Sequence, residues 1–102
     1  MRTAVLADIH ANLAALEAVL EDIAGQRVSE IICLGDNIGY GPDPCEVLRE
    51  VRQRRILSIL GNHEYAVQKR VYLERMNPDP KKSMEMTLQM LSPEDIAFIV
   101  RL

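Results

Sequence analysis

Ile56-Leu57-Ser58-Ile59-Leu60-Gly61-Asn62-His63-Glu64 is the stretch from which the rest of this 102-residue chain can be interpreted. Its first five residues form a short, largely apolar run rich in isoleucine, which predicts a buried strand. A glycine and then polar side chains follow directly, as is typical of a strand that presents functional groups at its carboxyl end. We therefore expect a strand over residues 56–60 and a functional loop immediately after it.

Two earlier stretches have the same organisation. Val5-Leu6-Ala7 runs into Asp8-Ile9-His10, and Ile31-Ile32-Cys33-Leu34 runs into Gly35-Asp36-Asn37. The ends of parallel strands meet at one edge of a sheet, so these loops should lie side by side. The polar side chains expected at that edge are Asp8, His10, Asp36, Asn62 and His63.

Helical patterns separate the predicted strands, and strands joined by helices of this length must be parallel with right-handed crossovers. The predicted fold class is therefore α/β, with three parallel strands and crossover helices. We expect strands over residues 3–7, 30–34 and 56–60, and helices from about residue 12 to 24 and from residue 44 onward.

Capping signals mark the starts of three of these helices. Asn12 is a predicted N-cap, Asp43-Pro44 with Glu46 predicts a capping box, and Ser92-Pro93-Glu94-Asp95 begins a last helix. The second helix also carries a row of arginines, which we interpret as a solvated face because acidic residues alternate with them. That row consists of Arg49, Arg52 and Arg54.

The periodicity is weaker beyond Glu64. Residues 65–73 are compatible with a helix, the segment Asn77-Pro78-Asp79-Pro80 should interrupt the chain, and a further helix should follow it. Three methionines at helical spacing are expected to fill the core and not to bind a cofactor. They are Met84, Met86 and Met90.

Composition limits the function classes. A chain of 102 residues, 48% hydrophobic and 26% charged, is typical of one small globular domain, residues 1–102. Its net charge of -3 gives no reason to expect nucleic acid or an anionic membrane as a partner. Asp8 interrupts the first apolar run too early for a signal peptide, so we expect a cytoplasmic protein. Cys33 and Cys45 match no zinc or disulfide pattern.

The five polar side chains at the predicted edge suit divalent metal ions, which take carboxylate, imidazole and amide ligands. Asp8 and His10 are two residues apart, so an extended chain points both side chains to one side. Asp36 can bridge two ions, and Asn62 supplies a neutral oxygen. Two such ions about 3.5–4 Å apart would activate a bridging water and stabilise charge on a transferring phosphoryl group. His63 would then be free to act as a general acid.

Simpler explanations exist for each residue alone. Asp8 and Asp36 could cap loops, Asn62 could be a turn residue, and His10 and His63 could be ordinary loop histidines. The occurrence of all five at the ends of consecutive strands favours a metal centre. A Rossmann-like or flavodoxin-like ligand-binding domain is a further alternative, although the first loop has no glycine to cradle a phosphate.

The three motifs together resemble the first three sequence blocks of the calcineurin-like metallophosphoesterases. The loop Gly35-Asp36-Asn37-Ile38-Gly39-Tyr40-Gly41-Pro42 is similar to that of small bacterial phosphoesterases and phosphodiesterases. It lacks the Asp-Arg pair that Ser/Thr protein phosphatases carry there, which argues against a phosphoprotein substrate. The resemblance implies that the chain hydrolyses a small phosphodiester or phosphomonoester with a water activated by two metals, manganese or else iron, nickel or zinc.

The same resemblance implies residue roles. Asp8, His10 and Asp36 would bind one ion, Asp36 and Asn62 would bind the other, and His63 would be the catalytic acid. The family adds further histidines and a second sheet from a later part of a domain about twice as long, whereas His10 and His63 are the only histidines here. We therefore expect the N-terminal half of a metallophosphoesterase domain.

Two functional hypotheses follow. One is a phosphoesterase whose missing ligands come from another chain or segment. The alternative is a catalytically inactive half-domain that acts in self-association or partner binding. Near-continuous apolar strands belong to sheets covered on both faces. An open apolar face on the order of several hundred Å² would cost about 10 kcal/mol at about 25 cal/mol per Å², so we expect a homo-oligomer.

Overall fold

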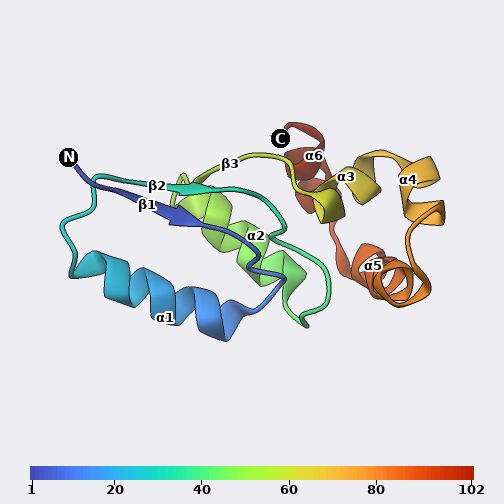
Figure 1. Ribbon diagram of the computed structural model, residues 1–102, viewed down its shortest axis with the longest axis horizontal. Coiled ribbons are helices and arrows are strands. Elements are labelled where there is room, and N and C mark those ends of the chain that lie inside the picture. The colour runs from blue at the N-terminus through green and yellow to red at the C-terminus, as the bar shows by residue number, and fades with distance from the viewer.

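The computed structural model describes residues 1–102 and shows a small parallel sheet with helices on one face and a helical part beyond its carboxyl edge (Figure 1). The elements, in chain order, are β1 (Thr3–Leu6), α1 (Leu13–Ala24), β2 (Glu30–Cys33), α2 (Pro44–Gln53), β3 (Leu57–Ser58), α3 (Asn62–Gln68), α4 (Arg70–Glu74), α5 (Pro78–Met90) and α6 (Pro93–Val100). No helix has the length and apolar character needed to cross a membrane.

The sheet has the order β1-β2-β3 with both pairs parallel, which confirms the predicted α/β fold with three parallel strands. Strand β3 is shorter than the predicted 56–60 strand. Ile56 N–H donates to Val51 O, so it still belongs to the turn after α2, and Gly61 already caps α3. The chain therefore passes from one helix to the next with only a brief pairing against β2.

The two faces of the sheet differ. Helices α1 and α2 cover one face (Figure 1). There a cluster of buried side chains fills the space between sheet and helices: Leu16, Leu20, Cys33, Val47, Val51 and Ile56. The opposite face carries Val5, Leu34, Leu57 and Ile59, all between 51% and 70% exposed. The sheet thus has one packed face and one open apolar face.

A second buried cluster holds the helical part together. It comprises Ile38, Leu48, Ala66, Leu73, Met84, Leu91 and Ile99. Met84 is fully buried, as predicted, but the expectation that Met86 and Met90 fill the core is wrong, since they are 57% and 43% exposed. Met86 and Met90 are four residues apart and share the side of α5 that does not face the core.

Two of the three predicted caps are confirmed. Asn12 accepts a hydrogen bond from Ala15 N–H, and Ser92 and Asp95 form a reciprocal capping box at α6. The box predicted at Asp43 is wrong, because Asp43 makes no side-chain cap bond. The predicted helix start is nevertheless confirmed, because Asp43 is the N-cap residue and Pro44 the first residue of α2. Asn77 is the N-cap of α5, so the Asn77–Pro80 segment starts a helix as well as ending the preceding turn.

Arg52 departs from the prediction that the arginine face of α2 is only solvated. Its Nη2 donates to Asp95 Oδ1 at 3.0 Å, and its guanidinium lies 5.7 Å from the centre of the Phe98 ring. Asp95 is 2% exposed. Burial alone would raise the pKa of Asp95, but hydrogen bonds from Ser92 and the positive charge of Arg52 outweigh it and hold the pKa below its ordinary 3.8. This ion pair joins α2 to α6.

The lowered pKa of Asp95 predicts a pH-dependent contribution to stability. The unfolded chain binds the Asp95 proton more tightly than the folded chain, so the contribution is present above pH 3.8 and is lost as the pH falls through the lowered pKa. Urea unfolding at about pH 6 and about pH 3 should show a larger loss for the wild type than for Asp95→Asn. Equal losses in the two proteins would contradict this assignment.

Candidate metal centre

The loops that follow β1 and β2 are joined to each other by backbone hydrogen bonds. Asp8 N–H donates to Gly35 O at 3.1 Å, His10 N–H to Asp36 O at 2.9 Å, and Ala11 N–H to Asn37 O at 2.8 Å. The pairing of the parallel strands thus continues past the ends of the sheet. It brings the first two predicted site segments into contact, as the sequence pattern indicated.

Glu64 joins the third segment to the second. Its carboxylate is fully buried and accepts backbone N–H groups from Asp36 at 2.8 Å, Asn37 at 2.9 Å, Gly61 at 3.0 Å and Ile38 at 3.4 Å. Burial raises the pKa of this carboxyl group, and the N–H donors offset part of the rise. Sequence reasoning assigned Glu64 no role. The available signal was a glutamate in the first turn of the helix that follows Gly61, the third helical position, where a carboxylate can accept backbone N–H groups of the preceding loop.

Asp36 and His63 bind each other from opposite sides of this junction. Asp36 Oδ1 accepts the His63 backbone N–H at 3.0 Å and lies 3.1 Å from His63 Nδ1. Partial burial would raise the pKa of Asp36, but these interactions with His63 outweigh it and lower the pKa. Asp36 is therefore held as a carboxylate at neutral pH, the form that binds metal.

His10 has the orientation usual for a metal-ligating histidine. Its Nδ1 lies 3.0 Å from Ile38 O, and because a carbonyl oxygen only accepts, this nitrogen carries the proton. In the neutral imidazole the other ring nitrogen, Nε2, then carries the lone pair and is available as a ligand. His10 Nε2 lies 3.6 Å from Asp8 Oδ1, so the two predicted ligands of this loop are in contact.

Backbone conformation at the site is unusual. Asp8, His10, Asp36 and Tyr40 all have positive φ, between 47° and 65°, a region that residues other than glycine seldom occupy. Such strained positions concentrate at functional sites and persist only where surrounding bonds hold them. Here the hydrogen bonds between the loops supply that restraint.

Two positions of the site require glycine, because neighbouring atoms lie too close to leave room for a Cβ. A Cβ on Gly61 would lie 2.3 Å from Asp36 N, and a Cβ on Gly39, whose φ is +88°, would lie 2.5 Å from His63 Cδ2. Neither position can accept a side chain without separating the loops from each other or from the imidazole. The glycine-rich composition of these segments therefore serves the packing of the site.

The structure brings three of the five predicted residues together. Ligand atoms of His10, Asp36 and His63 all lie within 4.8 Å of one another. Asp8 is at the edge of this group with its side chain 67% exposed. Asn62 is the first residue of α3 and is exposed, with no side-chain hydrogen bond, so it adjoins the cluster through the chain and not through a contact.

The donor set fits a divalent ion, since imidazole nitrogen and carboxylate oxygen are ligands of zinc, manganese and iron. One buried polar side-chain atom has no hydrogen-bond partner in the whole chain, and it is His63 Nε2. A buried imidazole nitrogen without a partner is suited to a ligand that the protein alone does not provide. The cluster of His10, Asp36 and His63 therefore combines metal-binding side chains with a ring nitrogen that has no partner in the protein, as expected of a metal or substrate site.

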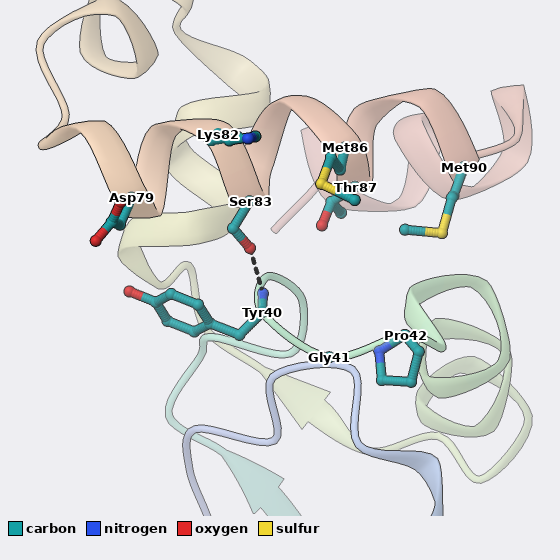
Figure 2. A pocket seen from close by; sticks show the side chains of 9 residues that line it. All are labelled: Tyr40, Gly41, Pro42, Asp79, Lys82, Ser83, Met86, Thr87 and Met90. Carbon is teal, nitrogen blue, oxygen red and sulfur yellow. Dashed lines mark hydrogen bonds between the residues drawn. The ribbon is translucent and has the colours of Figure 1, made fainter.

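Tyr40 is a site residue that sequence reasoning missed. Its ring centre lies 5.0 Å from that of His10 and 5.1 Å from that of His63. The Tyr40 backbone N–H donates to Ser83 Oγ at 2.7 Å, which anchors the loop after β2 to α5 (Figure 2). Tyr40 also lines two hollows, of about 540 Å³ and 320 Å³. The larger, drawn in Figure 2, lies between this loop and α5, and the smaller adjoins His63.

The Glu64 carboxylate predicts a specific cost of substitution. In Glu64→Gln an amide NH₂ would replace an oxygen that accepts two N–H groups, which should lower the free energy of unfolding by about 2–3 kcal/mol. Glu85→Gln is a matched control, because Glu85 is exposed on α5 and makes no hydrogen bond, and it should change that energy by less than about 0.5 kcal/mol. Urea unfolding measures both, and similar values for the two variants would contradict the role assigned to Glu64.

A family model and two known proteins match this chain over different lengths. A family model described as calcineurin-like phosphoesterase matches residues 1–97. An uncharacterised protein of Methanocaldococcus jannaschii is 38% identical over 96 residues, which are 94% of this chain and 40% of that protein. Serine/threonine-protein phosphatase 2 of Escherichia coli is 36% identical over 61 residues, which are 59% of this chain and 28% of that protein.

A solved structure agrees with these matches. The crystal structure of a metallophosphoesterase from Sphaerobacter thermophilus superposes with a TM-score of 0.80 and 42% identity, covering 100% of this chain and 41% of the other. The chain thus spans about two fifths of the length of the Methanocaldococcus and Sphaerobacter proteins. The resemblance inferred from the three motifs is confirmed, and this chain belongs to the calcineurin-like phosphoesterase family.

Proposed function

We propose that this chain forms the metal-binding part of a phosphoesterase that hydrolyses a phosphomonoester or phosphodiester bond of a small substrate. The observation that carries the proposal is the convergence of His10, Asp36 and His63, with ligand atoms within 4.8 Å, at the carboxyl edge of the sheet. Membership of the calcineurin-like family supports a metal-dependent reaction. The loop after β2 has no Asp-Arg pair, which favours a small phosphoester over a phosphoprotein.

Each predicted ligand has a proposed place. Asp8, His10 and Asp36 would hold one divalent ion, and Asp36 with Asn62 would contribute to a second. The protonated Nδ1 of His10 and the carboxylate form of Asp36 support ligation by these two residues. Ions bound here would supply an activated water and stabilise charge on the phosphoryl group. Manganese is the ion we propose, with iron, nickel or zinc as substitutes that the same donors accept.

His63 is the proposed general acid. Asp36 Oδ1 lies 3.1 Å from Nδ1 and orients the imidazole ring. Nε2 has no partner within the protein, so it is the atom from which a proton would pass to the leaving oxygen.

Both cysteines are free thiols, which supports a reducing compartment, and we propose the cytoplasm.

Two variants separate metal binding from proton transfer. Asp36→Asn should abolish manganese binding and manganese-dependent hydrolysis of bis(4-nitrophenyl) phosphate, whereas Asp22→Asn, an exposed control on α1, should change neither. His63→Ala should lower turnover by about 10²–10⁴-fold with metal content unchanged. Calorimetric titration with manganese measures metal binding even where turnover is slow. Unchanged manganese binding in Asp36→Asn would refute the metal site, and loss of metal in His63→Ala would make His63 a ligand.

We also propose that a second copy of the chain covers the open sheet face. Val5, Leu34, Leu57 and Ile59 form an apolar surface there, and all four are more than half exposed. Ile32 lies between Val5 and Leu57 in the strand register, so the surface is continuous across the three strands.

The exposed apolar face also supports the alternative function, a non-catalytic half-domain for self-association. Metal content per chain separates the two, because about two tightly held ions favour the phosphoesterase.

A charge on the open face should prevent this association. Leu57 is 70% exposed, so Leu57→Arg is expected to leave the fold intact and convert an oligomer to a monomer in light scattering at low micromolar concentration. Val71→Arg is the control, since Val71 is 64% exposed on α4, away from the sheet, and should leave the oligomer unchanged. A compact, cooperatively unfolding wild-type monomer would refute the proposed assembly.

A further inference from the structure

The smaller of the two hollows begins at the proposed catalytic acid and leads away from it. It has a volume of about 320 Å³ and is formed where α3 meets the turn between α4 and α5. The residues that matter here are Tyr40, Asn62, His63, Tyr72, Arg75 and Asn77. A substrate whose phosphorus lies at the cluster of His10, Asp36 and His63 would therefore extend its remaining part into this groove.

Arg75 gives the groove a positive charge. It is the only arginine or lysine among the lining residues, and no aspartate or glutamate lines the groove. Two other cations of the chain are paired, Lys81 with Glu74 at 3.0 Å and Arg52 with Asp95 at 3.0 Å. Arg75 has no carboxylate within ion-pair distance. Its guanidinium is therefore available to an anion from outside the protein.

The position of Arg75 is well defined by its neighbours. It caps the end of α4, where its backbone N–H donates to Tyr72 O at 3.1 Å. Tyr72 in turn packs its ring 5.1 Å from that of Tyr65, edge to face. On the other side Tyr40 packs against His63. The groove is thus lined by two aromatic side chains that each pack against another ring, Tyr40 and Tyr72, and by the cation of Arg75.

We propose that this groove binds the leaving-group side of the substrate and that Arg75 binds a second anionic group carried there. The proposal rests on the proposed function, because it places the scissile phosphate at the metal cluster. A guanidinium offers paired N–H donors that match phosphate oxygens. The substrate class is then a phosphoester whose leaving group carries a further phosphate, and Arg75 is a specificity-determining residue.

The larger hollow does not have this character. Its lining includes Lys82 together with Asp79, so it has no net charge, and its wall includes the exposed thioethers of Met86 and Met90 (Figure 2). Lys82 is exposed on α5 and has no ion-pair partner either. It is a matched control for Arg75, because it is an unpaired cation near Tyr40 that does not line the groove beside His63.

The test uses two ligands that differ by one phosphate, propane-1,3-diol bisphosphate and propyl phosphate, titrated by calorimetry into the metal-free chain. The wild type should bind the bisphosphate about tenfold more tightly, as one added charge-assisted contact allows. Arg75→Ala should reduce this preference to about twofold or less, Arg75→Lys should retain only part of it because the paired donors are lost, and Lys82→Ala should retain most of it. Circular dichroism checks that each variant is folded.

Several results would overturn the proposal. One is a preference for the bisphosphate that survives in Arg75→Ala. Another is an equal loss of affinity for both ligands in that variant, which would show that Arg75 binds the single phosphate. The third is no measurable binding of the bisphosphate by the wild type. The proposed function is tested separately by manganese-dependent hydrolysis of the same two ligands. Absence of hydrolysis with an Arg75-dependent preference intact would refute the phosphoesterase and leave the anion site standing.

Discussion

The buried carboxylate of Glu64 is the interaction on which the candidate metal centre depends. A carboxylate removed from water is costly unless hydrogen-bond donors replace the lost hydration, and here four backbone N–H groups do so. Three of those groups belong to the loop after β2 and one to the cap of α3, so a single side chain fixes two segments together. The bond from His63 N–H to Asp36 Oδ1 runs in the opposite direction and closes the junction. Asp36 and His63 are positioned as a consequence.

Beneath this junction a small polar network continues the same restraint into the sheet. Asn37 is fully buried, and its amide donates to Ser58 Oγ at 3.0 Å while its oxygen lies 3.3 Å from Cys33 Sγ. These contacts tie the loop to β2 and β3 at once. Buried polar groups that satisfy one another specify one arrangement of a core, because any other leaves a donor or acceptor unpaired. The strained backbone at Asp36 is held from below by this network and from the side by Glu64.

The site lies where the sheet meets the helical part (Figure 1), and the two parts contribute different features. Strand ends supply the metal-type ligands, Asp8, His10 and Asp36, on loops held together by backbone bonds. The helices supply His63 and the walls of both hollows. Ser83 of α5 also holds the glycine-rich loop through Tyr40 N–H. The proposed site therefore draws on both parts of the chain, and the open sheet face of β1 to β3 is the surface proposed for association.

Much of the fold and of the candidate site could be predicted from the sequence alone. Local signals were enough for the alternation of strands and helices, for the caps at Asn12 and Ser92, and for the set of polar residues at the strand ends. They were enough because strand periodicity, caps and glycine-rich turns depend on neighbouring residues. The same motifs identified the family, since their order and spacing are properties of the linear chain.

Only the tertiary structure decided the rest. The buried role of Glu64, the packing of Tyr40 on both histidines, the pairing of Arg52 with Asp95 and the exposure of Met86 depend on contacts between segments 23 to 43 residues apart or on which side of a helix meets the core. No local pattern records such contacts. A carboxylate after a histidine reads the same whether it faces water or four backbone amides, and the difference arises only when the loops close around it.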